Sequence, residues 1–106
     1  MTDERRREQL YIFISRLKAE PPTTAIAPDE LARQHHAYLH ELQRARVLVG
    51  SGPARDESGA RHGGGVIIIR AASLADAQAI AEREPYCREG QRAVEIIAWQ
   101  RTWWDD

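Results

Sequence analysis

The chain is poor in several kinds of residue, and each shortage excludes a class of protein. Only one of its 106 residues is cysteine, which excludes an internal disulfide and a cysteine-rich metal site. The apolar runs, such as Val66–Ile69, are far shorter than the roughly 18 to 20 residues that a membrane-spanning helix needs. Fifteen basic against sixteen acidic residues leave a net charge of −1, so no overall field attracts nucleic acid or an anionic membrane.

The N-terminal segment also lacks the apolar stretch of a signal peptide. We therefore expect a cytoplasmic protein with neither a membrane nor a nucleic-acid partner. A length of 106 residues predicts one domain, with its core at about 9–99, an N-terminal arm at 1–8 and a C-terminal tail at 100–106. The glycine-rich segments lack the Lys-Ser/Thr of a phosphate-binding loop, and we expect no cofactor.

Hydrophobic periodicity predicts six secondary-structure elements. The predicted strands are Gln9–Ser15, Val47–Gly52, Val66–Ala71 and Ala93–Trp99, with residues 54–65 as a polar hairpin connection. One predicted helix covers about 28–46, and a second is capped by Ser73 and ended by Pro85. The order β-α-β-β-α-β is that of the ferredoxin-like α+β fold, an antiparallel four-stranded sheet with two helices on one face.

The sheet face that the helices leave uncovered is itself apolar. Val66 and Ile68 alternate with Ile67 and Ile69, and Ile97 with Trp99 alternates with Val94 and Ile96, so both faces carry large side chains. An exposed apolar face of this size usually marks an interaction surface. We predict a homodimer formed face to face through the sheet; the alternative is a C-terminal tail that folds back over part of this face.

Two polar residues interrupt the apolar faces of the predicted helices. On a helical projection His35 lies about 20° from Leu42 and points toward the sheet, and Glu84 lies near the centre of the second helix's apolar stripe. A carboxylate directed inward is costly to bury unless it is paired, and a histidine on the neighbouring helix suits that role. Such a pair could move protons near neutral pH. The pattern alone leaves two interpretations open, an acid–base pair or a polar pair that only completes the core.

Several segments, taken with their spacing, resemble the YCII-related (YciI-like) family of the dimeric α+β barrel superfamily. They are His35–Pro53, the glycine run before Val66, Ser73–Ala77, and Glu84–Tyr86 followed by Gly90. The similarity covers about residues 9–99 and implies a dimeric barrel. In that family the motif histidine is paired with an aspartate of an Asp-Pro-Tyr/Phe motif, proposed as an acid–base dyad in a pocket. One relative in chloroaromatic degradation is a lactone dehalogenase.

The resemblance implies catalytic roles for His35 and Glu84. It also implies that a small-molecule ligand is contacted by Tyr38, Gly52, Pro53, Tyr86 and His62. This sequence departs from the family because Glu84 replaces the motif aspartate and keeps the carboxylate one methylene farther out.

A second departure concerns charge near the histidine. Ala32 stands where many family members have an arginine, which weakens an anion site there unless Arg33 or His62 supplies the charge. His36 and His40 form an i, i+4 pair without a third ligand, so no metal site is predicted.

Two functions remain open at this point. The first is a small enzyme of the lyase, isomerase or dehalogenase type, in which His35 acts as general acid or base on a lactone-like or other small carbonyl substrate. The second is a non-catalytic dimer that binds a small ligand.

Overall fold

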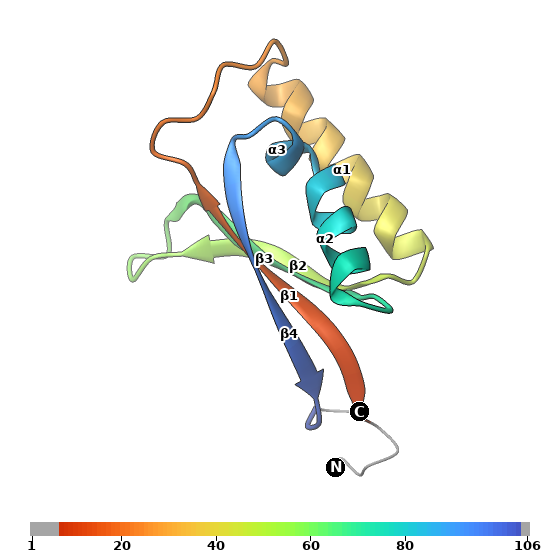
Figure 1. The fold of residues 1–106 in the computed structure, drawn as a ribbon. Coiled ribbons are helices and arrows are strands. Elements are labelled where there is room, and N and C mark those ends of the chain that lie inside the picture. The colour runs from red at the N-terminus through yellow and green to blue at the C-terminus, as the bar shows by residue number, and fades with distance from the viewer. Residues whose placement is uncertain (1–6, 105–106) are drawn as a thin grey trace.

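The computed structural model describes residues 7–104, so residues 1–6 of the predicted arm and 105–106 of the predicted tail lie outside the described part. Its elements follow one another as β1 (Glu8–Leu17), α1 (Pro28–Arg44), β2 (Leu48–Arg55), β3 (Arg61–Arg70), α2 (Leu74–Arg83), α3 (Pro85–Arg88) and β4 (Arg92–Arg101). The strands form one antiparallel sheet in the order β2-β3-β1-β4. All three helices lie on one side of it (Figure 1). The predicted ferredoxin-like α+β arrangement is confirmed.

The core lies between the sheet and α2. Tyr11 and Phe13 project from β1 toward the helices and pair across the ladder with Ile69 and Ile67 of β3. Ala77 of α2, like Ala81, packs against these four side chains. Small residues on the helix face let its backbone approach the large side chains of the sheet closely, as a densely packed core requires.

The β2–β3 hairpin is longer than predicted. Its strands continue to Arg55 and resume at Arg61, so the turn is confined to residues 56–60 and the glycine run Gly63–Gly65 belongs to β3. Asp56 Oδ1 closes the turn by accepting hydrogen bonds from the backbone N–H groups of Ser58 and Ala60, at 2.9 and 3.1 Å. Pro53 does not end β2, because this is an edge strand and can accommodate a residue without a backbone donor.

The ends of α2 follow the predicted signals. Ser73 Oγ accepts a hydrogen bond from Asp76 N at 3.1 Å, and the helix ends at Arg83, shortly before Pro85. Glu84 is extended and lies outside α2, contrary to the prediction that it is part of this helix. A further single-turn helix, α3, begins at Pro85 and was not predicted.

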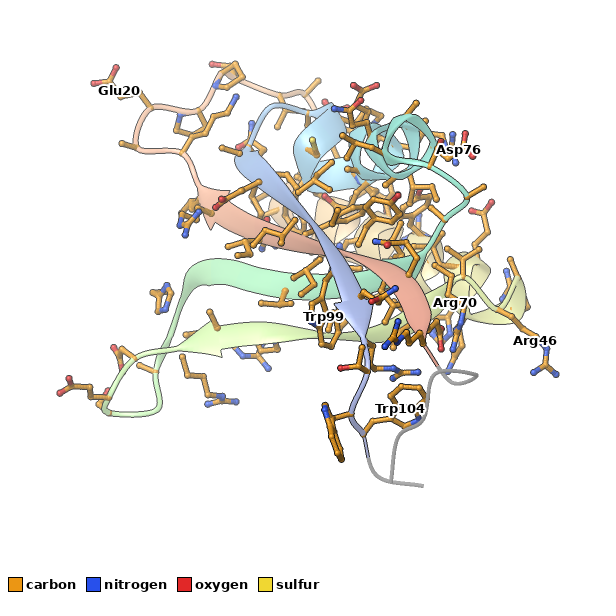
Figure 2. The ribbon with its side chains drawn as sticks, turned by 60° about the horizontal axis from the view of Figure 1, so that its bottom comes forward. Glu20, Arg46, Arg70, Asp76, Trp99 and Trp104 are labelled. Carbon is orange, nitrogen blue, oxygen red and sulfur yellow. The ribbon has the colours of Figure 1, made fainter. Side chains whose placement is uncertain are left out.

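The opposite face of the sheet has no helix over it. Val66, Ile97 and Trp99 are exposed there, and Trp99 lies toward the same end of the sheet as Trp104 (Figure 2). The Trp104 ring stacks on the Arg101 guanidinium, 4.4 Å from the ring centroid, whereas Trp103 is 74% exposed. The homodimer through this face remains a prediction. Within residues 7–104, no helix combines the length and the apolar character needed to cross a membrane.

Candidate functional site

A cavity of about 580 Å³ lies between α1 and the helix-covered face of the sheet, beside the core. Its sheet side includes Phe13 and Ser15 of β1 and Ser51 of β2. The register explains the space, because Phe13 pairs with Ile67 whereas Ser15, one pleat farther along, pairs with Gly65. Small residues at these helix-facing positions leave the volume that large side chains fill in the core.

The glycine run of β3 is required by strand spacing. A Cβ atom at Gly65 would lie 2.6 Å from the Gly52 carbonyl oxygen, and one at Gly64 would lie 2.6 Å from the Ser15 carbonyl oxygen. Both distances are too short for a carbon–oxygen contact, so the ladder closes here only with glycine. The same absence of side chains opens the cavity along β3.

His35 projects from α1 into the cavity wall. Its side chain is 16% exposed, and Nδ1 lies 2.6 Å from Glu84 Oε1. Among the described residues, no hydrogen bond to the other ring nitrogen, Nε2, accompanies this contact. A neutral imidazole that donates Nδ1–H to a carboxylate carries its lone pair on Nε2. The geometry therefore suits His35 to exchange a proton with a molecule in the cavity.

Glu84 is held by the backbone of α3. Its Oε1 accepts a hydrogen bond from Tyr86 N at 3.2 Å and its Oε2 accepts one from Cys87 N at 2.9 Å, so the side chain caps the helix that Pro85 begins. The residue is only 6% exposed. One carboxylate thus satisfies two helix donors and orients the His35 ring.

These contacts set the charge of Glu84. Burial raises the pKa of the Glu84 carboxyl, but the hydrogen bonds from His35, Cys87 and Tyr86 lower it by more, and the net pKa lies below the usual glutamate value. The carboxylate is therefore ionised at neutral pH. Its negative charge accepts the Nδ1–H of His35 and fixes the direction in which the ring points.

The other predicted ligand contacts divide into two groups. Gly52, Pro53 and Tyr86 line the cavity, and the Tyr86 ring centroid lies 5.1 Å from that of His35. Tyr38 and His62 are not part of the lining. The Tyr38 hydroxyl donates a hydrogen bond to the Ile80 carbonyl at 2.8 Å, because this face of α1 meets α2, and burial raises the pKa of the phenol.

His62 is exposed on the β2–β3 hairpin, where the strand register directs it away from the space beneath α1. Arg33 is also exposed and forms an ion pair with Glu30 on its own helix. Neither residue supplies the positive charge that the sequence suggested for the site near Ala32.

Two arginines of the cavity were not predicted from the sequence. Arg92 and Arg61 both line it, and the Arg92 Cζ atom lies 3.9 Å from the centroid of the Tyr86 ring. A signal for Arg92 was present, since it precedes Val94 and Ile96 at period two and so shares their helix-facing side of β4. The residue type nevertheless points the other way, because charged residues at a strand end usually face solvent.

No metal centre is evident in the described part of the chain. Residues 7–104 contain no group of three or more histidine, cysteine, aspartate or glutamate side chains arranged to hold an ion. His40, the second member of the i, i+4 pair, is exposed and lies outside the cavity lining.

The family is decided by a match to the YCII-related domain over residues 12–100, which is most of the chain. The chain belongs to the YCII-related family. Among curated proteins, no relative of this YCII-related chain is found. A solved structure with a similar fold is 5-chloro-2-hydroxyhydroquinone dehydrochlorinase (TftG) from Burkholderia phenoliruptrix AC1100, in complex with 2,5-dihydroxybenzoquinone. The TM-score is 0.61 at 19% sequence identity, over 85% of this chain and 92% of that one.

Proposed function

We propose that this YCII-related protein is an acid–base enzyme that acts on a small carbonyl compound, such as a hydroxylated quinone or a lactone. The observation that supports this most directly is the 2.6 Å contact between His35 Nδ1 and Glu84 Oε1 at the wall of a cavity large enough for such a molecule. In this proposal His35 is the proton-transfer residue, and Glu84 positions it.

The reaction would begin with removal of a proton from a C–H or O–H group conjugated with the carbonyl. The proton moves to His35 Nε2, and the electron pair that it leaves is delocalised onto the carbonyl oxygen. Return of the proton to another atom gives an isomerisation. Departure of a leaving group with its bonding electrons, as chloride for example, gives an elimination.

The structural neighbour supports this choice of substrate class. It is named as a dehydrochlorinase of a chlorinated hydroxyhydroquinone and holds a dihydroxybenzoquinone. We extend from it only the class, a small oxygenated ring, because the two chains share 19% identity.

We further propose that the working unit is a homodimer formed through the open face of the sheet. Val66, Ile97 and Trp99 are exposed on that face. Burying a single apolar face against a symmetry-related copy gives an isologous dimer.

The alternative is a non-catalytic ligand-binding dimer. Its supporting observation is that the Glu84 carboxylate also caps α3, so the His35 contact has a structural use whether or not any reaction occurs. In that case the cavity would retain ligands without converting them.

Replacement of His35 tests the proposal. His35→Asn keeps part of the hydrogen-bonding capacity but cannot take up a proton at neutral pH, and we expect kcat to fall by at least about two orders of magnitude with KM little changed. The assay would use 5-chloro-2-hydroxyhydroquinone, which presents a carbonyl in its keto tautomer, and a panel of small lactones. His40→Asn, on the exposed side of the same helix, is the matched control and should leave kcat unchanged.

Persistent turnover in His35→Asn would exclude this residue as the base. Compounds that bind tightly to the wild-type protein but are never converted would favour the non-catalytic alternative. Circular dichroism of both variants establishes that each remains folded.

A further inference from the structure

Arg92 occupies a distinctive position at the end of the cavity. It is the first residue of β4 and shares the helix-facing side of that strand with Val94. Its guanidinium lies over the Tyr86 ring, and the His35 ring also lies beside Tyr86, at a centroid distance of 5.1 Å. Arg92 and His35 therefore contact the same aromatic side chain and line the same cavity.

Unlike Arg16, Arg70 and Arg101 of the same sheet, Arg92 has no carboxylate partner in the described part of the chain. Arg16 pairs with Glu95 at 3.4 Å, and Arg70 pairs with Glu8 at 2.8 Å. The Nε atom of Arg92 is buried and has no hydrogen-bond acceptor among residues 7–104. Arg101 shares an unpartnered Nε, but its Nη2 binds Glu8 at 3.0 Å. Buried hydrogen-bond donors normally have acceptors. The Arg92 guanidinium is therefore suited to an acceptor atom supplied by a bound ligand.

The charge of the cavity lining has the same implication. Among the described lining residues Glu84 is the sole carboxylate, and both its oxygens already accept hydrogen bonds from His35 and α3. Arg92 and Arg61, which also line the cavity, form no ion pair with a carboxylate among the described residues. A ligand with an ionised oxygen would balance this excess of positive charge, and the planar fork of arginine matches such an oxygen well.

From these observations we propose that Arg92 binds an ionised oxygen of the ligand, so that the substrates of this site are small carbonyl anions. The ionised group is either a carboxylate or a deprotonated ring hydroxyl conjugated with a carbonyl. Stacking on Tyr86 holds the guanidinium in a fixed plane, and this places the anion beside His35. The inference rests on the proposed function for its carbonyl chemistry, while the binding of an anion can be measured without any turnover.

Calorimetric titration with two matched pairs of probes tests the proposal. The anions are 2,5-dihydroxybenzoquinone, a vinylogous acid that is ionised at neutral pH, and benzoate; their neutral counterparts are 2,5-dimethoxybenzoquinone and benzamide. We expect the wild-type protein to bind at least one anion more tightly than its counterpart. Arg92→Gln should weaken that anion by about ten- to a hundredfold and leave the neutral probe unchanged. The pair in which the anion is bound more tightly than its neutral counterpart shows whether the site takes an ionised ring hydroxyl or a carboxylate.

Two further variants keep the result interpretable. Arg92→Lys retains the charge and should recover part of the affinity, whereas Arg16→Gln removes an exposed arginine outside the cavity and should bind as wild type does. In the NMR spectrum of the wild-type protein, the Arg92 Nε–H resonance should shift when the preferred anion is added. A loss of stability in Arg92→Gln would lower affinity for both members of a pair, so a selective loss identifies the charge itself.

The outcomes separate this inference from the proposed function. If Arg92→Gln binds the anion as tightly as wild type, or if the wild-type protein binds neither anion, the inference is overturned even when His35→Asn abolishes turnover. If anion binding depends on Arg92 but no compound is ever converted, the anion site stands and the enzymatic proposal falls.

Discussion

The two ends of the helix-covered sheet face differ in the size of the side chains that the same paired strands carry. At one end Tyr11 pairs with Ile69, and α2 packs onto them through Ala77. At the other end Ser15 pairs with Gly65, and α1 spans a cavity. The backbone pairing continues without interruption across both ends. Side-chain volume at alternate positions therefore decides which part of the sheet becomes core and which part becomes a site.

The comparison predicts different costs for the same truncation at the two ends. Ile69 is 0% exposed within the core, whereas Ile67, on the same strand and face, lines the cavity. We expect Ile69→Ala to lower the free energy of unfolding toward the upper end of about 2–5 kcal/mol, and Ile67→Ala toward the lower end, because fewer neighbours surround it. Urea unfolding of both variants measures the difference. Equal losses would mean that the two ends are packed alike.

Glu84 links α1 to α3 through its hydrogen bonds with His35, Tyr86 N and Cys87 N, and acid should weaken this link. Glu84→Gln removes hydrogen bonds to a charged group and should cost about 1.5–3 kcal/mol at neutral pH. Since the pKa of the Glu84 carboxyl is lowered by folding, its contribution is complete above the ordinary value of 4.5 and is lost as the pH falls through the lower folded value.

Urea unfolding of wild type and Glu84→Gln between neutral and strongly acidic pH follows this loss. The two stabilities should converge as the pH falls below 4.5. A difference that stays constant into strong acid would contradict the role assigned to the ionised carboxylate.

The smallest expected effect concerns the glycines of the cavity end. A Cβ at Gly65 would meet the Gly52 carbonyl oxygen, whereas one at Gly52 would meet nothing within 4 Å. We expect Gly65→Ala to cost about 1–3 kcal/mol through overpacking and Gly52→Ala to change stability by less than about 0.5 kcal/mol. Thermal unfolding of the two variants compares them. A neutral Gly65→Ala would show that the strands can separate without loss.

The sequence predicted the fold better than the site. The element order, the Ser73 cap and the end of α2 before Pro85 follow from periodicity and from local backbone rules. The extent of the β2–β3 hairpin does not, because Gly63–Gly65 has the composition of a turn but occupies β3, where neighbouring strands come too close for side chains. Only the register reveals that requirement.

Whether a predicted site residue lines the cavity depends on which element its side chain contacts. His35 lies where α1 faces the sheet, but Tyr38, three residues later, turns to α2 and hydrogen-bonds Ile80. A single helix pattern cannot tell which part of an inward face meets a strand and which meets another helix. Arg92 was missed for a related reason, since the ring that makes its burial favourable belongs to Tyr86 on a different element.

The pairing of β1 with β4 has a consequence for how the chain folds. β1 is a central strand, yet one of its two partners is β4, and Gln9 contacts Trp99 across a sequence separation of 90 residues. Contacts this distant require a large loop to close before they contribute stability, which slows folding. Until β4 arrives, β1 presents an unpaired edge that carries Ile12 and Ile14. That edge is the point at which a partly folded chain is most exposed to aggregation.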